Sequence, residues 1–449
     1  TRHMRRYRWG VADRLLSVED SRRGETRYSY TPTGQLERAE YPDGREQWRK
    51  SDQTGNLYPD PDMRLRRYLG GGRLEQDGEW HCEYDADGNL TERYLGTGRW
   101  LDGKKDRWRY RWNADGSLAK VVRPDKREVE FTYDALGRRL SKSFGTTVTR
   151  WVWNGNVPLH QWKQHREYSV MEDRWNTDTE HRDMTVWLFD EDSFVPVAMI
   201  KEGRSYSILT DQLGTPTEAY DTEGNEVWSR VLDMDGNVIE ETGNKGMVPF
   251  LFQGQYYDRE TGLAYNRFRY YSPKMGVYVS QDPIGLGGGI LNLYGYVDDT
   301  NVWIDSFGLD WNYVLINSKG NVFYSGRASD NANLSDVARR HAGTKGADGT
   351  RFGNGDTLVQ ITKPQITSYA AARGVEQFGI MNSSTPLLGY RSTNVRGNKI
   401  AGISSSNRNI EIYMSEGESV INGKTLADMI AKGKKMTFEE YQTKKTYKK

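Results

Sequence analysis

Residues 109–118 read Arg-Tyr-Arg-Trp-Asn-Ala-Asp-Gly-Ser-Leu, and this stretch contains a unit of an aromatic residue, a glycine and a leucine. Trp112 precedes Gly116 by four positions, and Leu118 follows two positions after the glycine. Glycine adopts the positive φ angles of tight hairpin turns, and charged and aromatic residues alternate with period two before the turn. The stretch therefore predicts an antiparallel hairpin.

The same unit recurs along the first half of the chain, which predicts a long repetitive sheet. One hairpin cannot bury its own apolar face, so successive copies must stack or curl into a continuous surface. The number of copies argues against an ordinary β-sandwich. Further copies stand at Tyr30, Gly34 and Leu36, at Tyr84, Gly88 and Leu90, and, slightly stretched, at Tyr133, Gly137 and Leu140.

The composition agrees with a mostly β protein. The 449 residues include 47 Gly, 28 Tyr and 14 Trp but only 36% hydrophobic residues, which suits short strands whose aromatic side chains provide the burial. A lone cysteine, Cys82, excludes an internal disulfide and a cysteine-rich zinc site. No apolar run reaches the roughly 18 residues of a membrane span, and residues 1–4 lack a signal-peptide core. The chain begins inside repeat-like sequence, so we expect it to be part of a longer protein.

Charge divides the chain into an acidic part and a basic part. Residues 310–449 contain 20 Lys and Arg against 12 Asp and Glu, whereas the rest contains 43 against 50. A basic domain favours an anionic partner, and nucleic acid is the commonest one. The alternative is a solvated surface on which charge is unevenly scattered.

A set of sequence blocks resembles the YD-repeat shell of Rhs and related polymorphic toxin proteins. This resemblance implies a β-cage of antiparallel hairpins that encloses a C-terminal toxin. We expect a repeat shell over 1–253, an Rhs core-associated segment over 254–309 and a small α/β toxin domain over 310–449. The blocks are Gly254-Gln255-Tyr256-Tyr257-Asp258, Glu260-Thr261-Gly262-Leu263, Tyr265-Asn266-Arg267-Phe268-Arg269-Tyr270-Tyr271, Gln281-Asp282-Pro283-Ile284-Gly285-Leu286, Asn292-Leu293-Tyr294 and Asp305-Ser306-Phe307-Gly308-Leu309.

The resemblance also implies that an intramolecular aspartyl protease cuts the chain at the end of the shell. Two carboxylates can activate water and protonate the leaving amine, and the matching pair is Asp282 and Asp305. The implied scissile bond joins Leu309 to Asp310. The sequence departs from the family pattern at Asp299-Thr300 and Asp305-Ser306, where Asn-Pro and Asp-Pro are usual. The alternative is that both aspartates are merely turn residues.

The basic domain predicts a hairpin followed by helices. Residues 313–316 and 322–324 flank a glycine turn, and Leu334, Val337, Ala338 and His341 share one helical face. His341 is the only histidine after position 181, which disfavours a histidine-rich metal nuclease, and the domain has no cysteine nucleophile. With these classes set aside, a catalytic site in this domain would use tyrosine, arginine and one carboxylate.

That constellation resembles the GIY-YIG endonuclease fold. The resemblance implies a DNase in which Tyr313 or His341 relays the proton of water, Tyr324 orients it, and Arg339 or Arg340 contacts the phosphate. Magnesium or another divalent cation would be held by Glu376, because a hard cation tolerates one carboxylate plus waters and substrate oxygens. The matching residues are Tyr313, Tyr324-Ser325-Gly326, Arg339, Arg340, His341, Glu376 and, as the late asparagine, Asn398 or Asn407.

Two other functions remain open. An ADP-ribosyltransferase toxin would use Arg327, Ser404-Ser405-Ser406 and Glu416-Gly417-Glu418, and a non-enzymatic binding or adhesion module would leave the basic domain unexplained.

The Rhs resemblance further implies an antibacterial effector of a type VI secretion apparatus, delivered into the cytoplasm of target bacteria. Its implied partners are DNA, a cognate immunity protein, and chaperone and secretion components bound through a preceding N-terminal region.

Overall fold

A computed structural model shows two compact units, which we describe separately. Residues 1–282 and 290–306 form the first unit, and residues 283–289 and 307–449 form the second. The structure describes residues 3–11, 14–32, 34–96, 103–191, 193–282, 292–297, 299–302, 304–305, 310–329, 337–338, 341–342, 345–346, 349–360, 425–432, 434–437 and 439–440.

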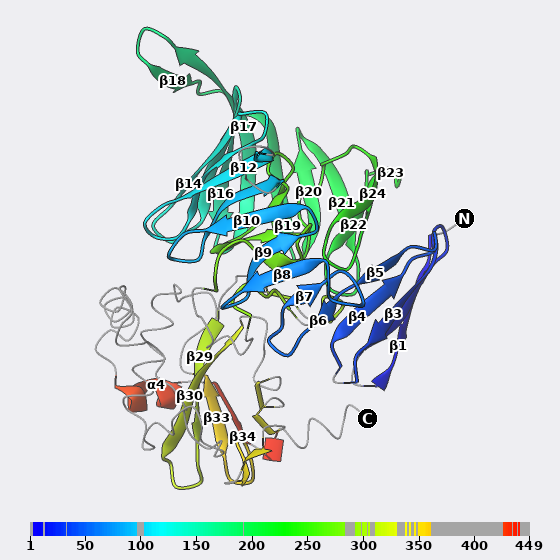
Figure 1. The fold of residues 1–449 in the computed structure, drawn as a ribbon, viewed down its shortest axis with the longest axis vertical. Helices are drawn as coiled ribbons and strands as arrows, with labels where there is room; N and C mark the ends of the chain where they lie inside the picture. Colours follow the sequence, from blue (N-terminus) through cyan, green and yellow to red (C-terminus); the bar gives the residue numbers. More distant parts are fainter. Residues whose placement is uncertain are drawn as a thin grey trace. The chain divides into compact units, whose positions relative to one another are not determined.

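The first unit begins with a five-stranded antiparallel meander (Figure 1). Its strands are β1 (Arg5–Trp9), β2 (Leu15–Asp20), β3 (Gly24–Tyr30), β4 (Leu36–Glu40) and β5 (Glu46–Trp48). A short two-stranded ribbon, β6 (Lys50–Ser51) and β7 (Leu57–Tyr58), follows.

A second and larger meander curls into a barrel. Most of its strands pair antiparallel with their neighbours in the chain, whereas β17 pairs with β16, β18 and β19. The end of β17 and β18 therefore form a hairpin that extends away from the other strands (Figure 1). The strands are β8 (Arg66–Leu69), β9 (Arg73–Asp77), β10 (Trp80–Tyr84), β11 (Leu90–Leu95), β12 (Lys105–Trp112), β13 (Leu118–Val122), β14 (Glu128–Tyr133), β15 (Arg139–Phe144), β16 (Thr147–Asn154), β17 (Val157–Ser169), β18 (Arg174–Thr177), β19 (Arg182–Phe189), β20 (Pro196–Lys201), β21 (Arg204–Thr210), β22 (Pro216–Tyr220), β23 (Glu226–Leu232) and β24 (Val238–Gly243).

The repeat unit forms the predicted hairpin turn. The glycines of the four copies have φ between 75° and 97°, a region that side chains other than glycine rarely adopt. In the copy at 112–118, the amide of Asn113 donates to the carbonyl of Ser117, and the amide of Gly116 donates to the carbonyl of Asn113. Trp112 then faces Leu118 across the ladder. The predicted mostly β fold of antiparallel hairpins is confirmed.

Successive hairpins are joined by bonds from the repeat aromatics. Each aromatic residue donates from its ring N–H or hydroxyl to a backbone carbonyl in the preceding repeat, so the buried polar tip is satisfied. Leu90 and Leu118 lie fully inside and belong to one shared core, and Leu36 is buried in the core of the N-terminal sheet. The bonds run from Tyr84 to Leu74 at 3.1 Å, from Trp112 to Leu90 at 2.8 Å, from Tyr133 to Leu118 at 2.7 Å and from Trp153 to Arg139 at 2.8 Å.

The stretched copy differs from the prediction at one position. Leu140 does not take the place of Leu118, because Tyr133 pairs with Arg139 across the ladder and Leu140 is 39% exposed. Arg139 is buried instead and donates to Asp258. The same register shift occurs next to Tyr84 and Trp112, so the copies differ only in the residue that faces the aromatic, which is a leucine in those two copies and Arg139 here.

Residues 249–282 place a small sheet against the inner wall of the barrel. Its strands are almost entirely buried on both faces, and its apolar residues share one core with those of the barrel. Hydroxyls of its tyrosines donate to carbonyls in the repeat turns, as Tyr265 does to Gly137 at 3.0 Å. The strands are β25 (Tyr256–Asp258), β26 (Leu263–Asn266), β27 (Arg269–Ser272) and β28 (Val277–Tyr278).

The second unit contains a four-stranded antiparallel sheet in the order β30-β29-β33-β34 (Figure 1). The predicted hairpin of this domain is confirmed, since β29 pairs with β30 around Gly320. Leu315, Phe323 and Phe352 pack in the core of this unit with Val337. No helix in the described ranges is long and apolar enough to cross a membrane. The elements are β29 (Asp310–Ile316), β30 (Val322–Ser329), β31 (Lys345–Gly346), β32 (Gly349–Thr350), β33 (Thr357–Gln360), α4 (Leu426–Lys432) and β34 (Lys434–Thr437).

Candidate functional site

The two aspartates predicted to cut the chain are brought together by one arginine. Arg269, on the buried strand β27, places Nη2 2.9 Å from Oδ2 of Asp305 and Nη1 3.4 Å from Oδ2 of Asp282. The arginine side chain is 3% exposed, and those of Asp305 and Asp282 are 12% and 16% exposed. Residues far apart in the sequence thus form one site because β27 lies between the segments that carry them.

Neighbouring polar groups hold Asp305 in place. The hydroxyl of Tyr278 donates to Oδ2 of Asp305 at 2.8 Å, and Nδ2 of Asn266 donates to the backbone carbonyl of Asp305 at 2.7 Å. The guanidinium of Arg269 lies 3.6 Å from the centroid of the Tyr278 ring. Burial raises the pKa of Tyr278 well above its usual value, and the charge of Asp305 raises that pKa further. Tyr278 therefore stays protonated and remains a hydrogen-bond donor.

A cation between two carboxylates determines what this site can do chemically. The guanidinium offsets the repulsion between the two carboxylates. Its planar fork also offers N–H donors to negative charge that develops on a reacting carbonyl oxygen. Leu309 lies outside the described residues. Asp310 begins β29, where its backbone pairs with Ser329.

In the second unit, the structure brings together two of the predicted nuclease residues and one unpredicted residue. The rings of Tyr324 and His341 meet edge to face with 5.1 Å between their centroids. The guanidinium of Arg351 lies 4.7 Å from the centroid of the Tyr324 ring, and its Nη1 lies 3.5 Å from Nδ1 of His341. His341 is only 1% exposed. The site thus combines a cation, an imidazole and a phenol.

Other predicted residues are placed by backbone only or lie outside the described residues. The backbone of Tyr313 pairs with Gly326 on one side and Gln360 on the other, and that of Arg327 pairs with Asn312. Within the described ranges, no three His, Cys, Asp or Glu side chains gather as a metal site. Outside those ranges lie Arg339, Arg340, Glu376, Asn398, Asn407, Ser404-Ser405-Ser406 and Glu416-Gly417-Glu418.

Sequence reasoning missed Arg269, Tyr278 and Arg351. Arg269 and Tyr278 stand within and just after a run of tyrosines and arginines that the resemblance singled out, but the run does not show which arginine faces Asp305. Arg351 directly precedes Phe352, a core residue of the second unit. An aromatic residue next to an arginine does not by itself indicate a functional site in the sequence. Only the structure shows that Phe352 is in the core and that Arg351 lies beside Tyr324 and His341.

These features define the class of protein. Repeated glycine-turn hairpins, a barrel joined by aromatic side chains and an inner segment packed in its core together make a β-shell of the YD-repeat type. The family model of the teneurin YD-shell matches residues 10–286, more than half of the chain. The chain belongs to this family, and the resemblance to Rhs and YD-repeat toxin proteins is confirmed.

Two relatives are similar over much of the chain. Double-stranded DNA deaminase toxin A of Burkholderia cenocepacia (strain H111) is 32% identical over 335 residues, covering 69% of this chain and 23% of that protein. Probable deoxyribonuclease RhsA of Dickeya dadantii (strain 3937) is 29% identical over 247 residues, covering 53% and 16%. The chain thus spans less than a quarter of the length of these relatives. The crystal structure of TcdB2-TccC3-TEV matches 68% of this chain and 18% of its own, with 16% identity and a TM-score of 0.41.

Proposed function

We propose that this protein is an Rhs-type antibacterial toxin whose shell carries a nuclease and cuts itself free from it between Leu309 and Asp310. Membership of the YD-shell family supports the shell part of this proposal. The named relatives are a DNA deaminase toxin and a probable deoxyribonuclease, which supports a toxin that acts on nucleic acid. The basic charge of residues 310–449 favours the same substrate.

For cleavage, water would attack the carbonyl carbon of Leu309. One carboxylate of the pair Asp282 and Asp305 would accept the proton of that water, and the other, once protonated, would donate to the departing nitrogen of Asp310. Arg269 would stabilise the oxyanion of the tetrahedral intermediate. The contact of both aspartates with Arg269 supports this step, because it holds the two carboxylates at one site.

For the nuclease, the contact of Tyr324 with His341 carries the proposal. His341 would accept the proton of the attacking water and Tyr324 would orient that water, while Arg351 would join Arg339 or Arg340 in binding the phosphate. His341 is almost entirely buried, whereas its neighbour Tyr324 is only half-buried. Tyr324 would therefore be the side of this pair that faces the substrate. Glu376 would hold the divalent cation, which offsets the phosphate charge when bound.

The nuclease is tested on plasmid DNA with the full chain, in Mg²⁺ and in EDTA. We expect loss of supercoiled DNA in Mg²⁺ only, and at least a hundredfold slower loss with Glu376→Gln or Tyr324→Phe. Glu418→Gln is the matched control, because it removes the same charge from the motif that a transferase would need. Intact DNA together with NAD consumption that Glu418→Gln abolishes would favour the ADP-ribosyltransferase, and neither activity would favour a binding module.

Delivery and neutralisation follow from the same proposal. A toxin that cuts DNA must reach the cytoplasm of a target cell, and the producing cell must block it. The proposed partners are therefore DNA, an immunity protein, and secretion and chaperone components that engage a preceding region. An immunity protein should be acidic where it covers Arg351 and the neighbouring basic residues.

A further inference from the structure

His3, which precedes β1, lies between carboxylates of two separate elements. Its Nε2 lies 2.8 Å from Oδ2 of Asp20 on β2, and its Nδ1 lies 2.7 Å from Oε1 of Glu218 on β22. The side chains of His3, Asp20 and Glu218 are 8%, 11% and 4% exposed. His3 therefore connects the N-terminal sheet to the wall of the barrel at a place that excludes most water.

This geometry requires both ring nitrogens of His3 to carry a proton. An ionised carboxylate only accepts hydrogen bonds, and a neutral imidazole has a single N–H. Burial raises the pKa of Asp20, but hydrogen bonds from the amide of Arg22 and the side chain of His3 outweigh this effect. A further bond from Arg5 helps to lower that pKa to about 2, so Asp20 is ionised. With one proton, His3 would turn a lone pair towards a carboxylate, which is unfavourable in a site with little water.

The charges around His3 favour the protonated ring. Asp20 and Glu218 are both bonded by Arg5, whose Nε lies 3.1 Å from Oδ2 of Asp20 and whose Nη2 donates to Oε1 of Glu218. The protonated ring of His3 supplies a second cation in contact with both carboxylates. The other charged and titratable groups around this cluster are Tyr7, Arg22, Arg23, Asp211, Tyr220, Glu226 and Glu240.

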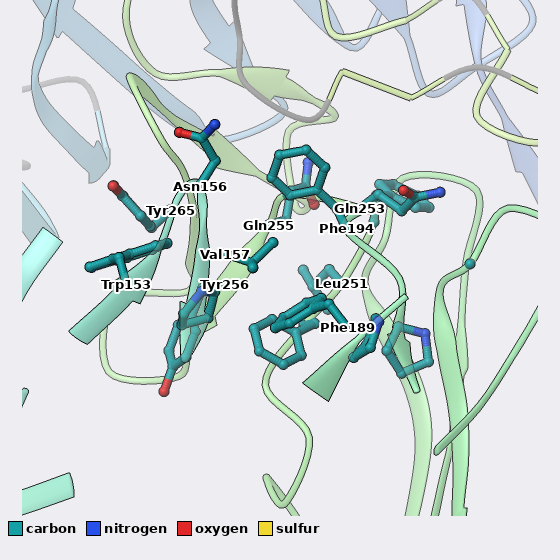
Figure 2. A pocket seen from close by; sticks show the side chains of 17 residues that line it. Trp153, Asn156, Val157, Phe189, Phe194, Leu251, Gln253, Gln255, Tyr256 and Tyr265 are labelled. Carbon is teal, nitrogen blue, oxygen red and sulfur yellow. The ribbon is translucent and has the colours of Figure 1, made fainter. Parts of the chain in front are cut away.

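The barrel behind this contact is filled without the N-terminal sheet. Where the turns before β17, β20 and β22 meet the segment leading into β25, the side chains in Figure 2 leave about 20 Å³, room for one water. Apolar residues of the sheet pack in a small cluster of their own with Met234, and within the described ranges the core of the barrel begins at Leu57. The edge formed by β1 and β2 can therefore separate from β22 while the barrel stays folded.

We propose that His3 is a pH-operated latch that fastens the β1–β2 edge of the N-terminal sheet to β22. At low pH the ring carries two protons and bridges Asp20 and Glu218. As pH rises through the range in which histidine titrates, the ring loses one proton, one carboxylate loses the donor that His3 gave it, and the edge opens. The free energy that holds the edge closed is thus larger at pH 5.5 than at pH 8. The latch belongs to the shell and does not depend on the nuclease or on self-cleavage.

Hydrogen exchange of the full chain tests the latch, followed by mass spectrometry at pH 5.5 and pH 8 and corrected for the intrinsic exchange rate at each pH. The parent protein and all variants carry Asp233→Asn, because Asp233 titrates in the same interval at another contact of this sheet with the barrel. In peptides that cover β1 and β2, we expect protection in the parent to fall at least fivefold from pH 5.5 to pH 8. His3→Lys keeps a cation at both pH values and should reduce this fall to less than twofold.

Two further variants keep the test decisive. His3→Gln removes the cation, so protection of the same peptides at pH 5.5 should drop to within twofold of the parent value at pH 8. His165→Gln is the matched control, because it removes an exposed histidine on β17, and it should keep the fivefold fall.

Three results would overturn the latch. The first is equal protection of β1 and β2 at the two pH values in the parent, and the second is an undiminished fall in His3→Lys or parent-like protection in His3→Gln at pH 5.5. The third is a fall of the same size in peptides that cover β13 and β14, which would assign the change to the whole fold.

Discussion

Arg139 shows how a single residue joins the inner segment to the barrel. Its guanidinium donates to Asp258 on β25 and lies over the rings of Trp151 and Tyr265, at 4.4 Å and 4.6 Å from their centroids. Lys142 adds a second cation, with Nζ 3.0 Å from Oδ1 of Asp258. Because these groups are almost entirely removed from solvent, their charges must remain paired for the fold to be stable.

We expect Asp258→Asn to lower the free energy of unfolding by about 3–5 kcal/mol, because it leaves the buried Arg139 without its carboxylate and leaves Lys142 with Glu260 alone. Adding Arg139→Leu should recover part of that loss, since leucine is the residue that other copies of the repeat place there. Chemical denaturation of both variants provides the measurement. A double variant less stable than Asp258→Asn alone would show that the ion pair is not what links the two elements.

The site residues were predictable from sequence only in part. Asp282 and Asp305 follow from their motif, but Arg269 does not, because several arginines flank the same tyrosines and only the burial of β27 selects one. Side-chain partners in a folded chain depend on distant strands that local patterns do not specify.

Among the elements, the turn between β23 and β24 joins the N-terminal sheet to the barrel. Tyr41, which follows β4, and Gln47 on β5 both accept from the amide of Met234 in this turn, each at 3.1 Å. Asp235 accepts from Nε2 of Gln47 at 2.8 Å. Burial, together with the charge of Asp235, raises the pKa of Asp233 to about 7.

This shift predicts that stability falls as pH rises. The pKa of Asp233 is higher in the folded chain than the value near 4 of an unfolded one, so between these values only the folded state holds the proton. The free energy of unfolding should therefore decrease from pH 5 to about pH 7 and then level off as far as this group is concerned. Thermal unfolding at pH 5, 6, 7 and 8 measures the effect.

Asp233→Asn is the control for the pH experiment, because an amide cannot titrate and still accepts from the amide of Asn237, as Asp233 does. The native chain should lose more stability than the variant over the interval from pH 5 to pH 7. Parallel curves for the two proteins would show that Asp233 titrates as an ordinary carboxyl and would refute its burial as a protonated group.

At the level of elements, the repeat was predictable to the residue except where an arginine replaces the inward leucine. Period-two patterns and turn glycines locate the hairpins at Tyr84 and Trp112, since local chemistry determines both strand and turn. The copy at Tyr133 has the same turn and register, but Arg139 occupies the inward position that a leucine takes in the other two, so Leu140 falls on the exposed face.

At the scale of the whole molecule, the shell accounts for a protein with few aliphatic residues. Aromatic side chains fill the barrel and bond to the turns, and the inner segment completes the core. The sequence predicted this architecture because a repeated unit has few ways to bury its apolar face. The proposed nuclease site was harder to predict, because Tyr324, His341 and Arg351 come from separate elements whose packing a single sequence does not determine.

The central claim is that the shell ends in a site that cuts its own chain, and the intact mass of the purified protein tests it most directly. We predict two species, 1–309 and 310–449, for the native chain, and one uncut species for Asp282→Asn and for Asp305→Asn. Asp299→Asn is the control and should be cut as the native chain is. One uncut mass for the native protein, or cutting at another bond, would contradict the account.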